Sequence, residues 1–462
     1  MDDSNKVRIA VSGHADSGKT TLVRTLLKRE VGRIADEVDT TTIATPYKVN
    51  VDDKISHLPA RFGEIIDCPG LQNAQVILDH ETKLAPFTQA VKEDDRAKYP
   101  LDFRALDAIG EADVALYVAT LETVPGSAHI DELKLVRSRC SRVIAILNQY
   151  NVVAGSKGVE KADNRVRSWT TMVQEQGVTS VITFDAHWDS PAKLADIYQA
   201  INQLLPDEKS TNFQLSIEDL RNLITVANRN GFKRIGELVA DVRSIHEDAD
   251  SHRYDYDCEK AKNELAALVQ DKAAVHLKKF LEHVVKEYTV AADPGTPSVN
   301  LHSSSVEESA AKLRGAAAGG AIGASIGGLA TAIGILVFPP AAALVPVILA
   351  AGTGTVGTIG VVVGRASTRP NSKVDVKPSA VGLHDIAKLG LAIFYGVSHQ
   401  GFGKASEVNK KTLSALVEFV AVHEQPVVLK DWAQASLQEI IEWCEQTCQR
   451  MEQSKQVYLL DN

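Results

Sequence analysis

GHADSGKTTL, residues 13–22, stands between the apolar run Val7–Val11 and the amphipathic run Thr21–Arg29. The spacing Gly-x-x-x-x-Gly-Lys-Thr is that of a loop whose backbone N–H groups surround phosphate oxygens. In such a loop the lysine reaches the outer phosphates, the threonine hydroxyl coordinates Mg²⁺, and the amino end of the next helix adds positive partial charge. We therefore predict a phosphate-binding loop formed by Gly13, His14, Ala15, Asp16, Ser17, Gly18, Lys19, Thr20 and Thr21.

A second motif, EIIDCPG at residues 64–70, ends an apolar run with an acid and continues with x-x-Gly. An acid at the end of the strand that follows a phosphate loop holds Mg²⁺ through water, and the glycine N–H meets the γ-phosphate. Because the loop after the glycine then responds to the γ-phosphate, it can act as a switch. We expect Asp67 to bind Mg²⁺ and Gly70 to sense the γ-phosphate.

Three threonines in DTTTIATP, residues 39–46, lie between the first helix and the next strand. A threonine in this place closes over Mg²⁺ in nucleotide switches. We prefer Thr41, with Thr40 as the next choice; a threonine-rich entry into a strand is the alternative. The expected Mg²⁺ ligands are Thr20, Thr41 and Asp67, and the expected catalytic residues are Lys19 and Thr41.

Short apolar runs alternate with amphipathic stretches from residue 7 to about residue 206. This alternation is typical of a parallel sheet flanked by helices. The predicted strands are Val7–Val11, Tyr47–Val51, Phe62–Ile66, Val114–Val118, Val143–Leu147 and Val178–Phe184.

The motifs GHADSGKTTL, TTT and DCPGL resemble the GTPase superfamily with the Ras-like fold, and its Era/TrmE-like bacterial branch in particular. The layout is similar to that of bacterial GTPases that carry a C-terminal helical domain of unknown function with a Gly/Ala-rich hydrophobic segment. That resemblance rests on GHADSGKTTLVRTL, DCPGLQNA, ADVALYVAT, VIAILNQY and FDAHWDSP. It implies GTP and GDP as ligands, Mg²⁺ as cofactor and GTP hydrolysis as activity.

The predicted base-binding residues depart from this family's pattern. Guanine is normally read by Asn-Lys-x-Asp, whereas this chain has Asn148, Gln149 and Asn151 at the matching positions. An amide offers one acceptor and one donor where guanine presents two donors. Asp185 and Ala186 lie where the last base-contact loop is expected. GTP remains the expected ligand through the resemblance, with base selectivity open.

The residue directly after DxxG is Leu71, where many GTPases have a glutamine or histidine that orients the attacking water. A leucine cannot orient water, so we expect slow hydrolysis. Acceleration would come from an activating protein, from homodimerisation or from another loop residue.

Residues 315–364 contain no Asp, Glu, Lys, Arg or His and are rich in glycine and alanine. Two stretches of 23 residues, 316–338 and 341–363, are separated by Pro339–Pro340. As helices, each would be about 34 Å long, enough to cross a bilayer core of about 30 Å. Glycines four residues apart allow close helix packing in lipid, and basic residues on both sides place both ends in the cytoplasm. The alternative is a helical hairpin buried in a soluble domain.

The expected fold is α/β: a P-loop G domain with a mainly parallel sheet, followed by an α-helical region that contains this glycine-rich hydrophobic hairpin. We place the G domain at residues 1–210, a helical region at 211–300, the linker and hairpin at 301–380, and a second helical region at 381–462.

The formal net charge of −9 argues against a general nucleic-acid binder, so no nucleic-acid partner is expected. The expected function is a GTP-binding switch and slow GTPase, associated with the membrane through residues 315–364. Its expected location is the cytoplasm, at the cytoplasmic face of the inner membrane, with both termini in the cytoplasm. The alternatives are a soluble regulatory GTPase that acts through a protein partner, and a ribosome- or RNA-linked GTPase.

Overall fold

The structure is a computed structural model that describes residues 6–27, 41, 43–48, 63–83, 96–250, 258–288, 361–363, 373–399, 410–424 and 432–454. The chain divides into two compact units. Unit 1 comprises residues 1–225 with the short segments 290–295 and 399–405, and unit 2 comprises the remainder.

Unit 1 is built on a six-stranded sheet with the strand order β2-β3-β1-β4-β5-β6. Its strands are β1 (Arg8–Gly13), β2 (Thr45–Lys48), β3 (Glu64–Asp67), β4 (Val114–Thr120), β5 (Val143–Asn148) and β6 (Ser180–Thr183). All neighbouring pairs are parallel except β2 with β3. The predicted α/β fold with a mainly parallel sheet is therefore confirmed, and all six predicted strands are present with shifted ends.

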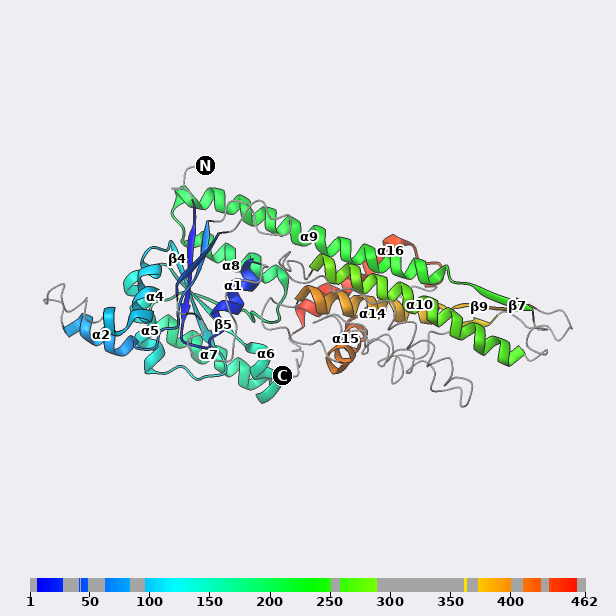
Figure 1. The fold of residues 1–462 in the computed structure, drawn as a ribbon, viewed down its shortest axis with the longest axis horizontal. Coiled ribbons are helices and arrows are strands. Elements are labelled where there is room, and N and C mark those ends of the chain that lie inside the picture. Colours follow the sequence, from blue (N-terminus) through cyan, green and yellow to red (C-terminus); the bar gives the residue numbers. More distant parts are fainter. Residues whose placement is uncertain are drawn as a thin grey trace. The chain divides into compact units, whose positions relative to one another are not determined.

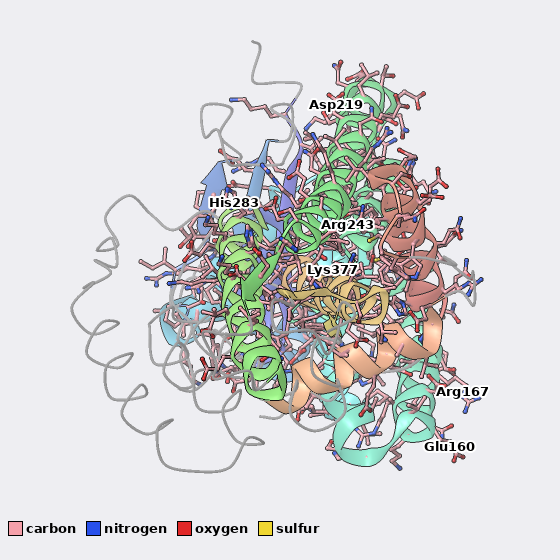
Figure 2. The ribbon with its side chains drawn as sticks, turned by 90° about the vertical axis from the view of Figure 1, so that its right-hand side faces the viewer. Glu160, Arg167, Asp219, Arg243, His283 and Lys377 are labelled. Atoms are coloured by element: carbon pink, nitrogen blue, oxygen red, sulfur yellow. The ribbon has the colours of Figure 1, made fainter. Side chains whose placement is uncertain are left out.

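Helices cover both faces of this sheet (Figure 1). Side chains alternate along a strand, so Ile9 and Val11 of β1 face one layer while Ala10 faces the other. The first layer holds α1 (Lys19–Leu27), α8 (Pro191–Leu204) and the start of α9 (Asp207–Arg243). The second holds α2 (Ala74–Lys83), α4 (Pro100–Gly110), α5 (Ser127–Arg139) and α7 (Val159–Glu175), and α6 (Tyr150–Lys157) precedes α7. The exposed Glu160 and Arg167 of α7 point outward (Figure 2).

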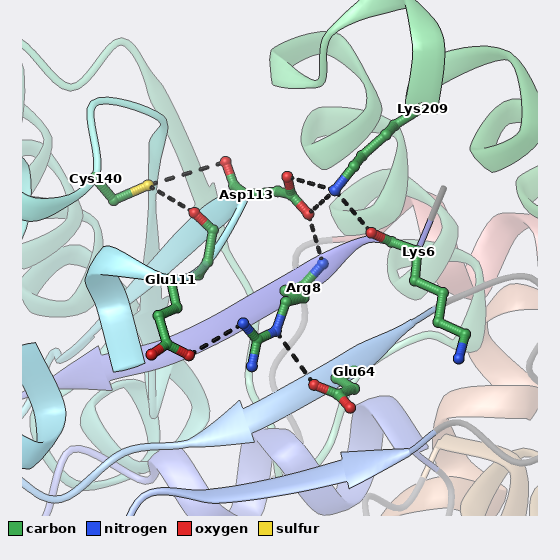
Figure 3. A network of polar contacts seen from close by, with 8 residues as sticks. Lys6, Arg8, Glu64, Glu111, Asp113, Cys140 and Lys209 are labelled. Carbon is green, nitrogen blue, oxygen red and sulfur yellow. Dashed lines mark hydrogen bonds and ion pairs between the residues drawn. The ribbon is translucent and has the colours of Figure 1, made fainter. Parts of the chain in front are cut away.

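A polar network attaches the first turn of α9 to the amino end of β1 (Figure 3). Lys209 Nζ lies 2.7 and 2.8 Å from the two carboxylate oxygens of Asp113 and 2.8 Å from the carbonyl oxygen of Lys6. Asp113 also accepts the backbone N–H of Arg8, whose guanidinium pairs with Glu64. The predicted domain boundary at residue 210 thus falls within a continuous helix.

Unit 2 packs the later part of α9 with α10 (Cys258–Tyr288), α14 (Ala380–His399), α15 (Lys410–His423) and α16 (Leu437–Gln453). It also contains an antiparallel sheet with the order β7-β9-β8, formed by Glu247–Asp250, Lys373–Pro378 and Val361–Val363. The sequence predicted only helices here.

One part of the predicted hairpin is wrong. Val361–Val363, assigned to the end of its second helix, forms β8 and pairs with β9. Three consecutive β-branched residues lose side-chain freedom in a helix and suit an extended strand. The rest of residues 315–364 lies outside the described residues. Among the described helices, α14 alone is long and apolar enough to cross a membrane, and 67% of its most apolar window is buried.

Candidate functional site

The phosphate loop depends on two glycines that no other residue could replace without strain. Gly13 has a φ of +138°, and a Cβ atom there would lie 2.2 Å from the carbonyl oxygen of Val118. Gly18 has a φ of +86°, and its Cβ would lie 2.3 Å from Nδ2 of Asn148. Asp16, between them, also has a positive φ of 60°. The loop therefore keeps its backbone against β4 and β5, with Ala15 and Asp16 at its turn.

Lys19 begins α1 and is only 7% exposed. Its Nζ donates to the carbonyl oxygen of His14 at 2.6 Å, and the Ser17 hydroxyl donates to the same oxygen at 3.0 Å. Burial is the main cause that lowers the pKa of the Lys19 ammonium. The Lys19 ammonium is buried against its own loop. Because solvent screens a buried charge little, a phosphate bound in this loop would interact strongly with it. Thr21 follows in α1 and is partly buried.

Three oxygen-bearing side chains from distant segments meet at the start of α1. The Thr20 hydroxyl donates to Asp67 Oδ2 at 2.8 Å and lies 3.2 Å from the Thr41 hydroxyl. Asp67 is 1% exposed, and its Oδ1 has no hydrogen-bond partner among the described residues. Burial raises the pKa of Asp67 to about 6. Buried carboxylate and hydroxyl oxygens of this kind suit Mg²⁺, so the residues fit the ion. Thr40 lies outside the described residues.

The segment after Asp67 packs directly on the phosphate loop. A Cβ atom at Gly70 would lie 2.9 Å from Cα of Ala15, so only glycine fits there. The backbone N–H of Leu71 donates to the carbonyl oxygen of Gly13 at 3.2 Å, and the Leu71 side chain is fully buried. The structure thus brings together the predicted phosphate loop, Mg²⁺ ligands and γ-phosphate sensor.

Asp102 of α4 holds this segment in place, and no sequence motif had indicated this role. Its Oδ1 accepts the backbone N–H groups of Gln72 and Asn73 at 2.8 and 3.0 Å, and its Oδ2 accepts the Asn73 side chain at 2.9 Å. Asp102 is buried, so these bonds anchor the start of the expected switch loop to α4.

A buried carboxylate also lies behind the phosphate loop. Glu132 of α5 accepts hydrogen bonds from His14 Nδ1 and from the hydroxyl of Tyr117 in β4. The bond to Glu132 is the main cause that raises the pKa of His14. His129, one turn before Glu132, stacks edge-on between His14 and Trp169. Glu132 therefore holds the phosphate loop in place through its hydrogen bond with His14. Its only sequence signal is an acid on an otherwise apolar helix face.

The predicted base-binding residues lie at the carboxyl ends of β5 and β6. Asn148 Nδ2 donates to the carbonyl oxygen of Ser17 at 3.0 Å, which ties this region to the phosphate loop. Asn148 Oδ1 accepts the backbone N–H groups of Gln149 and Ala186, both at 2.9 Å. Gln149 has a φ of 64°, and its side chain accepts the hydroxyl of Thr120.

Asn151 and Asp185 join the two loops. The backbone N–H of Asn151 donates to Asp185 Oδ2 at 2.9 Å, and its side-chain Nδ2 donates to the carbonyl oxygen of Trp188 at 2.8 Å. Asp185 is 3% exposed and also accepts the N–H of His187. Burial raises the pKa of Asp185 to about 6. The predicted base-binding residues thus lie next to one another. Asp185 accepts hydrogen bonds from backbone N–H groups of these loops.

Comparison with known proteins agrees with this geometry. Residues 8–154 match the family model described as 50S ribosome-binding GTPase. A search of curated proteins found no match.

Solved structures with similarity include a variant of Aquifex aeolicus Era bound to GDP and aluminium fluoride, at 18% identity and a TM-score of 0.30. They also include Era with MgGDPNP and nucleotides 1506–1542 of 16S ribosomal RNA, at 16% identity and a TM-score of 0.31. A third is the bacterial selenocysteine-specific elongation factor EF-Sec, at 17% identity and a TM-score of 0.29.

These alignments cover 44, 44 and 43% of this chain, and 58, 58 and 28% of the other chains, so each spans less than two thirds of the known protein. The assignment of residues 8–154 rests on the family match and on the geometry of the phosphate loop. Residues 8–154 form a P-loop GTPase domain, as the sequence resemblance implied.

Proposed function

We propose that the chain is a GTP-binding switch that uses Mg²⁺, hydrolyses GTP slowly and associates with a membrane through residues 315–364. The observation that carries the nucleotide part is the meeting of Thr20, Thr41 and Asp67 beside the buried Lys19. Thr20, Thr41 and Asp67 would hold Mg²⁺, Asp67 through water. The ion would neutralise charge on the phosphate oxygens.

The residues around the phosphates support a switch. Lys19 would exchange the carbonyl oxygen of His14 for phosphate oxygens. Thr41 lies 3.2 Å from Thr20 although 21 positions separate them, so an ion bound by both would hold the segment of Thr41 against α1. Gly70 lies against Ala15, where its N–H would meet a γ-phosphate. Loss of that phosphate would therefore release both segments at once.

Slow hydrolysis is supported by Leu71. Its side chain is fully buried and has no hydrogen-bonding group, so it cannot orient water. Gln72 is exposed, and Asp102 holds its backbone. We expect an intrinsic rate on the order of 10⁻³ s⁻¹ or lower, as for GTPases that await an activator. An activating protein or a second copy of the chain would supply the missing group.

Membrane association is supported by the uncharged segment and its basic flanks, Lys312, Arg314, Arg365 and Arg369. We therefore propose the cytoplasmic face of the inner membrane as the location of the protein, with both termini in the cytoplasm. Nucleotide state would decide whether the segment is sheltered or released. A soluble regulatory GTPase with the same segment as a structural hairpin is the alternative.

A ribosome-linked role is a second candidate, because the matching family model is described as ribosome-binding. The net charge of −9 disfavours RNA as the direct partner. Sedimentation of the purified protein with ribosomes at 50 and 200 mM salt separates this candidate from the first.

The test is partitioning of the full chain onto bacterial-lipid vesicles with GDP, with a non-hydrolysable GTP analogue and without nucleotide. We expect the bound fraction to change at least threefold between nucleotides in the wild type and to stay constant in Lys19→Ala. Equal partitioning in every sample would refute the coupling. Failure of the wild type to bind vesicles in any state would refute the membrane role.

A further inference from the structure

The base-binding loops are built around an amide at residue 151. Trp188 offers Asn151 a carbonyl oxygen, which only accepts hydrogen bonds, so the atom that faces it at 2.8 Å must be the amide nitrogen. The described residues make no hydrogen bond to Asn151 Oδ1. The side chain therefore presents Oδ1 as an acceptor and the second N–H of Nδ2 as a neighbouring donor.

A carboxylate at this position would conflict with the same contacts. One of its oxygens would lie against the carbonyl oxygen of Trp188, where two acceptors repel. It would also add negative charge beside Asp185, which accepts the Asn151 backbone N–H at 2.9 Å. Asp185 is buried and Asp189 is partly buried, and burial raises the pKa of each. The loops therefore favour an amide over an aspartate.

The amide lies where the base of a bound nucleotide would be read. Asn148 links these loops to the phosphate loop through the carbonyl oxygen of Ser17. Ligands of open α/β sheets lie at the carboxyl ends of the strands, and Asn148 ends β5. With phosphates in residues 13–20, the base would extend along Asn148 towards Asn151.

The donors and acceptors of the amide do not match guanine. Guanine presents N1–H and the 2-amino group on one edge, which are two donors. Xanthine presents N1–H and the 2-oxo group, a donor beside an acceptor, and hypoxanthine presents N1–H beside a bare C2–H. Asn151 Oδ1 can accept N1–H in all three, while its remaining N–H finds a partner only on xanthine.

We propose that this site discriminates poorly against xanthine and hypoxanthine nucleotides, and binds xanthine nucleotides more tightly than guanine nucleotides. The proposal rests on the proposed function, since it assumes a purine nucleotide in the phosphate loop. A guanine 2-amino group that faces a donor loses one hydrogen bond and leaves the amide N–H without a partner. We expect this difference to favour xanthine about tenfold.

The experiment is calorimetric titration of the full chain with GDP, XDP, IDP and ADP, each with Mg²⁺. We expect XDP to bind about tenfold more tightly than GDP, IDP within about threefold of GDP, and ADP most weakly. Asn151→Ala should bring GDP, XDP and IDP within about threefold of one another. Asn151→Asp should reverse the preference and favour GDP over XDP by about 10- to 100-fold. Asn164→Asp, which adds the same charge on the exposed face of α7, should change none of these ratios.

Tighter binding of GDP than XDP by the wild type would overturn the proposal and leave the proposed GTPase function intact. An unchanged preference for XDP in the Asn151→Ala protein would also overturn it. Because Asn151→Asp introduces repulsion with Trp188, its melting temperature is measured first, and the Asn151→Ala comparison decides if it does not fold. Tightest binding of ADP, or no binding of any nucleotide, would overturn both proposals.

Discussion

Replacing Asp67 with asparagine should stabilise the ligand-free protein while it abolishes Mg²⁺-dependent nucleotide binding. Asp67 is buried, and its Oδ1 has no hydrogen-bond partner among the described residues. Burial raises its pKa from 3.8 to about 6, in spite of the Thr20 hydroxyl and the Lys19 ammonium, which both lower it. Without a bound cation, the ionised carboxylate at neutral pH is therefore a cost to the native state.

The size of that cost follows from the shift of about two pKa units. At 1.4 kcal/mol per unit, an ionised Asp67 lowers the free energy of unfolding by about 3 kcal/mol. Asparagine keeps the bond from Thr20 but places an N–H where Oδ1 has no partner, which costs about 1–2 kcal/mol. The net gain of about 1–2 kcal/mol should raise the melting temperature by about 2–8 °C.

The pH dependence has a defined sign. The native state binds the Asp67 proton more tightly than the unfolded chain, so this stabilisation is complete below about pH 4 and is lost as the pH rises past about 6. Asp185 has a similarly raised pKa and contributes to both proteins alike. The advantage of Asp67→Asn should therefore be present at pH 7.5 and shrink towards pH 5.

The assay is thermal unfolding followed by circular dichroism, with a chelator and without nucleotide, at pH 5 and 7.5. The same variant should lose at least 100-fold in affinity for GDP with Mg²⁺. A melting temperature at pH 7.5 that is below the wild-type value would refute the reasoning about the buried charge. Unchanged affinity for GDP with Mg²⁺ would refute the assignment of Asp67.

Three further predictions concern other contacts. Lys209→Met should lower the free energy of unfolding by about 2 kcal/mol, measured by urea denaturation. The reason is that the partly buried Asp113 carboxylate would lose the cation that pairs with it. Gly231→Ala should cost about 1–3 kcal/mol in the same assay, because its Cβ would lie 2.1 Å from the ring of Phe394. Leu71→Gln should cost about 2 kcal/mol without raising the rate of phosphate release from GTP, because the side chain at this position is fully buried.

Matched control variants test the physical reason given for these predictions. Lys233→Met removes an exposed pair, Lys233 with Glu237 on α9, and should cost less than about 1 kcal/mol. Gly110→Ala, where a Cβ atom would meet nothing within 4 Å, should not destabilise the protein. Equal losses in each pair would contradict the argument from burial and packing. Faster hydrolysis by Leu71→Gln would contradict the argument from its buried side chain.

The G domain was predictable because its motifs are local. The phosphate loop places backbone geometry and side-chain chemistry within eight residues, and Asp67 follows at the end of the next parallel strand. Both appear in the sequence as fixed spacing. The five parallel strands were predictable for a similar reason, since buried parallel strands are continuous apolar runs.

The contacts that support the site were not predictable, because they join residues far apart in the chain. His14 meets Glu132 across 118 positions, and Asn151 meets Asp185 across 34. Asp102 looks like an ordinary acid in the first turn of a helix. The sheet of unit 2 was missed because β7 has the sequence EDAD, whose strand state depends on its pairing with β9.

The most direct test of the central claim is GTP binding and hydrolysis by the full chain with and without Mg²⁺, beside the Lys19→Ala protein. We expect GTP binding that needs Mg²⁺, slow phosphate release, and a loss of at least 100-fold in affinity on replacing Lys19. GTP binding that is unchanged by Lys19→Ala, or that is the same in Mg²⁺ and in a chelator, would contradict this claim.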